Sequence, residues 1–359
     1  MVLPRRRKRI KKIRRGRMSP RVLLLPVAVL YWVGTSVRSW LYDVGIMRSR
    51  TFGKPVICVG NITVGGTGKT PVIEHIAERL TDEGFRVAVV SRGYRRKTKG
   101  QVIATEGSTA EEVGDEPRQI KKHYPRVDVV VDADRGAAID TAIGRGADVV
   151  LMDDGMQHRS VSPSALILVC DYARPLWRDL PLPAGNKRES MYARLRADVV
   201  IINKCPKDLT RAQAEEIFAR LSLNDGQRIF FTSVVYGELK DAEEHTVTDT
   251  LLNTLGAVAV AGIGRPGPFF AEVQRRFTAH ELQMVAYEDH HAYSAQELAK
   301  LEGMLDAEGQ NSYLVTTEKD AARLPRKVGR HAVLRLPIKL EILFGEGEKF
   351  DQLVCSMSR

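Results

Sequence analysis

A glycine-rich stretch between residues 63 and 70 has the composition of a phosphate-binding loop. It follows an apolar run that ends at Val59 and precedes a stretch in which apolar residues recur at helical spacing. Glycines let backbone N–H groups turn toward a bound phosphate, and the positive end of the following helix adds to the attraction. In such a loop the lysine contacts the β- and γ-phosphates of a nucleotide, and the next hydroxyl binds Mg²⁺. The predicted nucleotide site comprises Thr63, Val64, Gly65, Gly66, Thr67, Gly68, Lys69 and Thr70.

Two adjacent acidic residues could complete this nucleotide site. Asp153 and Asp154 directly follow the apolar run Val149–Met152. A carboxylate at the end of such a strand can hold Mg²⁺ directly or through a water molecule. Two acids in a turn are a weak signal alone, but together with the loop they predict a metal site made of Thr70, Asp153 and Asp154.

The chain lacks the N-K-x-D motif expected of a protein that recognises guanine. After one apolar run it reads Asn203-Lys204-Cys205-Pro206, with proline in place of the aspartate. A second partial match, Thr317-Glu318-Lys319-Asp320, lies after a strand of a different unit. We therefore predict ATP as the nucleotide, and a GTP-dependent regulatory switch is disfavoured.

Two places in the sequence offer a general base for a kinase. Asp115 lies in Val-Gly-Asp-Glu-Pro, and residues 289–291 read Asp-His-His. A carboxylate and an imidazole in contact could together accept the proton of a sugar hydroxyl. If the two motifs belong to different domains, their contact couples the chemistry to domain closure. The alternative is that the Asp-His-His run is only a polar surface turn.

After residue 50, short apolar runs alternate with amphipathic stretches, which is typical of a parallel sheet covered by helices on both faces. The first set of predicted strands is Pro55–Val59, Val87–Val90, Val127–Val131, Val149–Met152, Leu166–Cys170 and Val199–Ile202. A second α/β unit is indicated by strands Ile229–Val235, Ala257–Gly262 and Tyr313–Thr316 and by helices near Gln213–Leu221 and Ala295–Leu305. Ligands of open α/β sheets bind at the carboxyl ends of the strands, where the polar motifs stand.

These patterns predict an α/β fold of the P-loop NTPase type, with a mostly parallel sheet and helices on both faces. We expect a basic arm and membrane-associating segment over residues 1–50, a P-loop kinase core over 51–235, and a smaller α/β domain over 236–359 that closes over the active site. The boundary near residues 205–240 is poorly defined by the sequence.

The positive charge of the chain lies in its N-terminal arm. The 359 residues include 55 Lys and Arg against 44 Asp and Glu, but residues 1–50 hold 14 of the basic residues and one acid. The remaining residues carry 41 basic and 43 acidic side chains, so the body of the protein need not bind polyanions. The four cysteines lie far apart, which argues against a disulfide framework, a zinc knuckle or a redox motif and fits a reducing compartment.

An uncharged stretch, residues 22–37, follows the basic arm. It resembles a signal peptide, but no small-residue cleavage site follows it. As a helix it would span about 24 Å, less than a bilayer core requires, and Pro26 interrupts it. Tyr31, Trp32 and Trp40 suit a headgroup interface, and the basic arm suits anionic lipid. We therefore predict a helix on the membrane surface; a solvated arm with a buried helix and an RNA-binding arm are the alternatives.

Taken together, the motifs resemble one family, the tetraacyldisaccharide 4′-kinases of lipid A biosynthesis. The stretches that carry the resemblance run in the family's order and read VGNITVGGTGKTP (59–71), SRGY (91–94), VGDEP (113–117), DDGMQH (153–158), LPAGNKRE (182–189), AGIGRP (261–266), DHHAYS (289–294) and TEKDAARL (317–324). The resemblance implies transfer of the ATP γ-phosphate to the 4′-hydroxyl of a tetraacylated glucosamine disaccharide 1-phosphate, giving lipid IVA. It also implies an enzyme peripheral or monotopic at the cytoplasmic face of the inner membrane, next to an anionic surface, with no nucleic acid as a partner.

The same resemblance implies roles for individual residues. Asp115 corresponds to the catalytic aspartate and His290 to its histidine partner, with His291 the less favoured choice. The nucleotide and metal residues are those already predicted from the loop and the paired acids. Polar positions on the substrate side correspond to Arg92, Tyr94, Arg135, His158 and Glu189.

Three features depart from the expected patterns. Thr63 stands where the loop motif usually begins with glycine, and Asn186-Lys187 replaces a Pro-Leu pair of the family. The basic arm extends beyond the family's usual start, which we interpret as a lipid-surface anchor. A nucleic-acid-binding ATPase is the alternative that the arm alone would suggest, and it predicts salt-sensitive binding to RNA or DNA.

Overall fold

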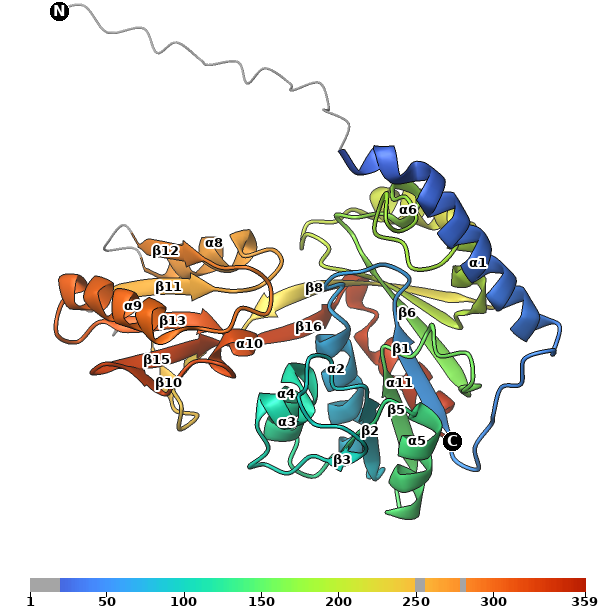
Figure 1. The fold of residues 1–359 in the computed structure, drawn as a ribbon, viewed down its shortest axis with the longest axis horizontal. Coiled ribbons are helices and arrows are strands. Elements are labelled where there is room, and N and C mark those ends of the chain that lie inside the picture. The colour runs from blue at the N-terminus through green and yellow to red at the C-terminus, as the bar shows by residue number, and fades with distance from the viewer. Residues whose placement is uncertain (1–19, 249–255, 278–281) are drawn as a thin grey trace, which may run out of the picture.

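The protein, described by a computed structural model over residues 20–248, 256–277 and 282–359, is built on two β-sheets (Figure 1). The larger sheet has nine strands in the order β16-β8-β7-β6-β1-β5-β2-β4-β3. The seven strands from β8 to β4 in this order are parallel to one another. The two edge strands, β16 and β3, pair antiparallel with their neighbours. We call the part of the chain on this sheet the core domain. Its strands are β1 Val56–Gly60, β2 Val87–Ser91, β3 Val102–Ile103, β4 Asp128–Val131, β5 Val149–Asp153, β6 Ala165–Asp171, β7 Val199–Asn203, β8 Arg228–Tyr236 and β16 Ile338–Ile342.

Helices cover both faces of the core sheet because its strands are apolar on both sides. One face packs against α2, α4 and α11, and the other against α5 and α6. The core-domain helices are α1 Leu25–Asp43, α2 Lys69–Asp82, α3 Ala110–Val113, α4 Asp115–His123, α5 Arg135–Gly144, α6 Arg211–Leu221 and α11 Gly347–Met357, with 3-10 turns η1 Pro20–Leu24, η2 Leu176–Arg178, η3 Met191–Arg196 and η4 Leu343–Gly345.

The second domain is a smaller sheet, with the order β10-β9-β15-β13-β11-β12 and β14 paired to β15. Its four strands from β15 to β12 are parallel, and helices α8 and α9 pack on opposite faces. Its elements are β9 Leu239–Lys240, β10 Thr246–Val247, β11 Ala257–Ala261, α8 Gly267–Arg276, β12 Gln283–Ala286, α9 Ala295–Glu308, β13 Tyr313–Thr317, α10 Glu318–Ala321, β14 Lys327–Val328 and β15 His331–Leu336.

The predicted fold class is confirmed, but the division of the chain differs from the expected ranges. Strand β8, which the sequence pattern grouped with the second unit, joins the core sheet beside β7. The chain returns from the second domain through β16, which pairs with β8, and ends in α11 against α2. Residues 338–357 therefore belong to the core domain and not to the second domain. Two adjacent strands, β8 and β16, carry the chain between the domains (Figure 1).

Candidate active site

The glycine-rich loop joins β1 to α2 at the carboxyl end of the core sheet, which is where ligands bind in open α/β sheets. Gly65 and Gly68 have φ of +95° and +89°, a conformation that favours glycine. Gly68 immediately precedes α2, so the loop leads into the positive end of a 14-residue helix. The buried Thr67 hydroxyl accepts a hydrogen bond of 3.1 Å from the Asn61 side chain, which fixes the loop from inside.

Asn203 and Lys204 support the loop from the end of β7. The Asn203 amide donates to the carbonyls of Thr67 (3.0 Å) and Gly68 (3.2 Å), and a Cβ on residue 68 would overlap that amide nitrogen. The Lys204 ammonium donates to the Gly66 carbonyl. The sequence pattern marks these residues only as an incomplete guanine motif. In the folded chain both residues hold the phosphate loop through its carbonyl groups.

Asn203→Ala is expected to lower the free energy of unfolding by about 1–3 kcal/mol, because it leaves buried polar partners without a hydrogen bond. The Asn203 side chain is fully buried and also accepts a hydrogen bond of 3.0 Å from Thr232. Urea denaturation with and without ATP measures the effect. Asn224→Ala, an exposed asparagine in the turn after α6, is the matched control and should change stability by less than about 0.5 kcal/mol. Equal stability of both variants would contradict the supporting role.

The paired acids at the end of β5 lie beside the lysine of the loop. Lys69 Nζ is 3.4 Å from Asp154 Oδ1, and Arg188 Nη2 is 2.8 Å from the same oxygen. The Ser91 hydroxyl donates to Asp153 Oδ2 at 3.0 Å. Asp154 has a positive φ of +51°, a strained conformation of the kind that occurs at functional sites. The structure thus brings the predicted phosphate lysine and the predicted metal acids together.

The two acids have opposite electrostatic environments. Burial raises the pKa of Asp153 to about 6, and the charges of Asp154 and Glu116 add to the rise. Burial also opposes ionisation of Asp154, but the cations of Lys69 and Arg188 outweigh it and lower the pKa of Asp154 to about 2.

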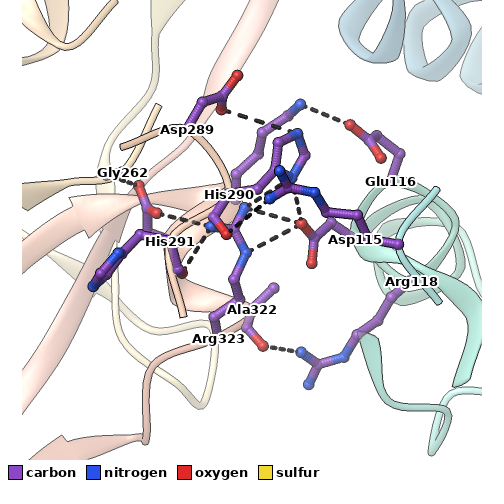
Figure 2. A network of polar contacts seen from close by, with 12 residues as sticks. Asp115, Glu116, Arg118, Gly262, Asp289, His290, His291, Ala322 and Arg323 are labelled. Carbon is purple, nitrogen blue, oxygen red and sulfur yellow. Dashed lines mark hydrogen bonds and ion pairs between the residues drawn. The ribbon is translucent and has the colours of Figure 1, made fainter. Parts of the chain in front are cut away.

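The start of α4 meets the second domain at the predicted catalytic pair (Figure 2). His290 Nδ1 is 2.8 Å from Asp115 Oδ2, and both side chains are largely buried. His290 has a positive φ of +62° and its ring packs edge-on against Tyr94 at 6.0 Å between centroids. His291 instead bonds Glu297 at 3.0 Å and does not reach Asp115 in the structure. Of the two histidines, the geometry favours His290.

Further contacts fasten α4 to α10 of the second domain. Lys319 Nζ is 3.0 Å from Glu116 Oε1, and His123 Nε2 is 3.1 Å from Glu318 Oε1. Burial opposes protonation of His123, but hydrogen bonds to Glu318 and Glu74 outweigh it and raise its pKa to about 9. An ion pair at each end of α4 therefore sets the orientation of the helix that begins with Asp115.

The predicted substrate-side residues fall into two groups. The first group comprises Arg92, Tyr94, Arg135 and His158. Tyr94 packs on His290. Burial lowers the pKa of His158, and the positive charge of Arg135 lowers it further. Arg92 and Tyr94 are exposed, whereas Arg135 is buried and donates to the Asp132 carbonyl at 2.6 Å.

Glu189 has a different environment from the other substrate-side residues. One of its oxygens accepts from Gln157 at 2.8 Å and the other pairs with Arg196. Its side chain is largely buried in this network, so the structure gives it protein partners on both oxygens.

One comparison with known proteins decides the family. The sequence model of a family described as Tetraacyldisaccharide-1-P 4'-kinase matches residues 20–358, nearly the whole chain. The chain belongs to this family. A tetraacyldisaccharide 4'-kinase of Porphyromonas gingivalis (strain ATCC BAA-308 / W83) is 41% identical over 347 residues, covering 92% of this chain and 96% of the relative. One of Flavobacterium johnsoniae is 38% identical over 321 residues, covering 89% and 92%.

The fold agrees with that of a solved member of the tetraacyldisaccharide 4′-kinase family. The structure described as the "apo" form of LpxK from Aquifex aeolicus in complex with ATP superposes with a TM-score of 0.75 at 30% identity, covering 95% of this chain and all of that one. The predicted family, the kinase class and the P-loop type of fold are confirmed.

Two departures from the expected 4′-kinase motifs meet in space. Thr63 forms an antiparallel bridge with Lys187, and the Val64 amide donates to the Asn186 carbonyl at 2.8 Å. Because main-chain atoms make these contacts, the loop over residues 180–189 can pair with the start of the phosphate loop despite the changed side chains. The same loop carries Arg188, which lies in the stretch LPAGNKRE but was not predicted to have a role. The motif does not indicate that this arginine is a partner of the metal acids, because that contact is made only in the folded chain.

Proposed function

We propose that this chain transfers the γ-phosphate of ATP to the 4′-hydroxyl of a tetraacylated glucosamine disaccharide 1-phosphate, giving lipid IVA. Its family membership supports the reaction class and the lipid A precursor as substrate. The observation that carries the proposal is the 2.8 Å contact between Asp115 and His290, because it joins a base to its partner across two domains beside a phosphate loop. A nucleotide-binding module without a phosphoryl acceptor would not need that pair.

In the proposed reaction the loop residues 63–70 bind the ATP phosphates through backbone N–H groups, and Lys69 contacts the β- and γ-phosphates. Asp115 accepts the proton of the 4′-hydroxyl while the oxygen of that hydroxyl forms a bond to the γ-phosphorus. The bond between the γ-phosphorus and the bridging oxygen breaks, and ADP leaves with that electron pair. His290 orients the carboxylate through Nδ1. The cations at the loop stabilise charge on the transferring group, which supplies most of the catalysis.

The residues beside the loop fit Mg²⁺. Thr70, Asp153 and Asp154 provide only oxygen donors, which Mg²⁺ prefers, and it commonly takes one or two carboxylates together with substrate phosphates and waters. When bound, Mg²⁺ supplies positive charge at the β- and γ-phosphates. Asp154 is paired with Lys69 in the structure, and its low pKa keeps the carboxylate ionised, as a ligand of Mg²⁺ must be.

We further propose that Arg92, Tyr94, Arg135 and His158 face the acceptor sugar and its phosphate. Arg92 and Tyr94 are exposed after the end of β2, and Tyr94 packs against His290. Glu189 acts less directly: its contacts to Gln157 and Arg196 hold the loop that carries Arg188.

Helix α1 is proposed to lie on the cytoplasmic face of the inner membrane. The stretch Arg21–Asp43 is long and apolar enough to cross a bilayer by length and composition, but only 6% of its apolar window is buried. Seven apolar side chains at spacings of three and four form one exposed stripe, which comprises Leu23, Val27, Leu30, Val33, Val37, Trp40 and Val44. The basic arm that we predict to bind anionic lipid lies outside the described residues.

The opposite face of α1 is attached to the core domain. Ala28 is buried, the Tyr31 hydroxyl donates to the Arg188 carbonyl at 3.1 Å, and Arg159 pairs with Asp43 at 2.7 Å. A helix that is anchored on one face and apolar on the other suits a peripheral or monotopic position, because the anchored face cannot also face lipid. The Tyr31 contact places the membrane-facing helix against the loop beside the phosphate site, so an acceptor held in the bilayer could reach it.

Replacing Leu23 and Leu30 together with glutamate is expected to weaken binding to anionic vesicles by roughly 10²-fold or more, since each buried leucine contributes about 1.5–3 kcal/mol. Vesicle co-flotation at several lipid concentrations measures the partition. Transfer to a detergent-dispersed acceptor should stay near the wild-type rate, because neither residue touches the site. Met284→Glu, an exposed apolar residue of the second domain, is the matched control. Unchanged vesicle binding of the double variant would refute the membrane-surface proposal.

The proposed function is tested by incubating the full chain with γ-labelled ATP, Mg²⁺ and a detergent-dispersed tetraacyldisaccharide 1-phosphate. We expect label in the lipid fraction and one ADP formed for each lipid phosphorylated. ATP hydrolysis at the same rate with and without the acceptor would contradict the proposal.

A further inference from the structure

Arg323, directly after α10 in the second domain, is the side chain most closely associated with the proposed catalytic pair. Its Nε and Nη2 lie 3.1 and 3.0 Å from Asp115 Oδ2, and Nη1 donates to the His291 carbonyl at 3.2 Å (Figure 2). Nη1 also lies 3.4 Å from Asp320, a fully buried carboxylate. The side chain is only 11% exposed, so its direction is fixed by these contacts.

All of the contacts to Asp115 fall on one oxygen. His290 Nδ1 and the Arg323 guanidinium both bind Oδ2, and within the described part of the chain no hydrogen bond or ion pair falls on Oδ1. A carboxylate oxygen that already contacts a guanidinium and an imidazole is a poor proton acceptor, because protonation would weaken the charge-assisted contact with the arginine. The oxygen that remains available to a hydroxyl group is therefore Oδ1.

We propose that Arg323 is a positioning residue for phosphoryl transfer: together with His290 it fixes Asp115 Oδ2, keeps the carboxylate ionised, and leaves Oδ1 to accept the proton of the acceptor hydroxyl. The inference rests on the proposed function, in which Asp115 is the base. It assigns His290 the role of orienting the carboxylate, because the imidazole nitrogen that contacts Asp115 is already engaged.

The charged groups around Asp115 give the sign of the pH effect. His290 and Arg323 face it directly, Lys319 faces it but is paired with Glu116 at 3.0 Å, and Asp289 and Asp320 lie beyond His290 and Arg323. Burial favours the protonated carboxyl, but the two direct partners outweigh burial, so the pKa of Asp115 lies below its usual value. A base that must be ionised loses activity when the pH falls through its pKa. Removing the guanidinium therefore moves that loss to higher pH.

The test compares Arg323→Met with Arg323→Lys by measuring kcat from low to neutral pH with saturating ATP and acceptor. For Arg323→Met we expect kcat at neutral pH to fall about 10- to 100-fold and the acid midpoint to rise by about 1 pH unit or more, because an adjacent opposite charge lowers a carboxyl pKa by 1–3 units. For Arg323→Lys the charge remains but the two-nitrogen contact is lost. We expect the acid midpoint to stay near the wild-type value while kcat falls.

Arg326→Met is the matched control, because Arg326 lies three residues further on, is 80% exposed and pairs with Glu243 on the surface. Its kcat and acid midpoint should equal those of the wild type. An acid midpoint of Arg323→Met equal to that of the wild type, with both variants folded by thermal melting, would overturn the proposal. If the wild type transfers no phosphate to lipid, the proposed function fails first, and the Asp115 titration followed by carbon NMR in both chains still tests the Arg323 contact.

Discussion

Replacing Lys69 with alanine is expected to reduce phosphate transfer by on the order of 10³-fold. The ammonium lies at the start of α2, 3.4 Å from Asp154, and is the cation of the glycine-rich loop. Removing one group that stabilises charge in a transition state costs on the order of 10²–10³-fold, and loss of a cation at a transferring phosphoryl group costs up to about 10⁵-fold. The substitution also leaves Asp154 with Arg188 as its remaining cation, which weakens the arrangement that would hold Mg²⁺.

The Lys69→Ala measurement is the initial rate of label transfer at saturating ATP, with a thermal melt to establish folding. Lys54→Ala is the matched control, because Lys54 is an exposed lysine just before β1 that pairs with Asp148 at the surface. It should keep the wild-type rate. A Lys69→Ala rate within about tenfold of wild type would show that the loop is not the phosphate site, since a transition-state cation is worth more than that.

Replacing Asp115 with asparagine is expected to lower kcat by about 10²–10⁴-fold with little change in the KM for ATP, because general-base catalysis contributes about that much and the residue does not touch the loop. The amide has nearly the shape of the carboxylate but cannot accept a proton at neutral pH. The loss should therefore appear in kcat and not in ATP binding.

The control for Asp115→Asn is Glu111→Gln, a surface acid of α3 that pairs with Lys97 and is 67% exposed. Since Asp115 contacts both Arg323 and His290, thermal melting must accompany the kinetics to separate a folding defect from a catalytic one. A raised KM for ATP with an unchanged kcat would contradict the role of Asp115 as base.

The sequence predicted the parts of the fold that depend on local pattern. Six apolar strands of the core sheet are found within one or two residues of the expected ranges, because strands buried on both faces are nearly continuous apolar runs; they are β1, β2, β4, β5, β6 and β7. The short strands β3, β9, β10 and β14 have two residues each and were not predicted. Strand β16 was missed for a different reason: its pairing with β8, more than a hundred residues earlier, is a long-range contact that a local pattern does not encode.

The candidate site divides in the same way. The phosphate loop could be found from its spacing, since glycine, lysine and threonine act there through the local backbone. The contact of Asp115 with His290 could be suggested by residue type, but its 2.8 Å geometry depends on how the two domains meet. Arg188, Asn203 and Arg323 lie in stretches that the sequence marks, but they act through tertiary contacts. Their partners are far away in the chain, so the motifs alone do not indicate their roles.

The measurement that tests the central claim most directly is the position of the new phosphate in the lipid product. The wild-type chain is incubated with ATP, Mg²⁺ and the tetraacyldisaccharide 1-phosphate, and the purified lipid is analysed by phosphorus–proton correlation NMR. The account predicts a second phosphate monoester coupled to the proton at the 4′-carbon, and its absence when the acceptor lacks the 4′-hydroxyl. A product phosphorylated at another position, or ATP hydrolysis that leaves the lipid unchanged, would contradict it.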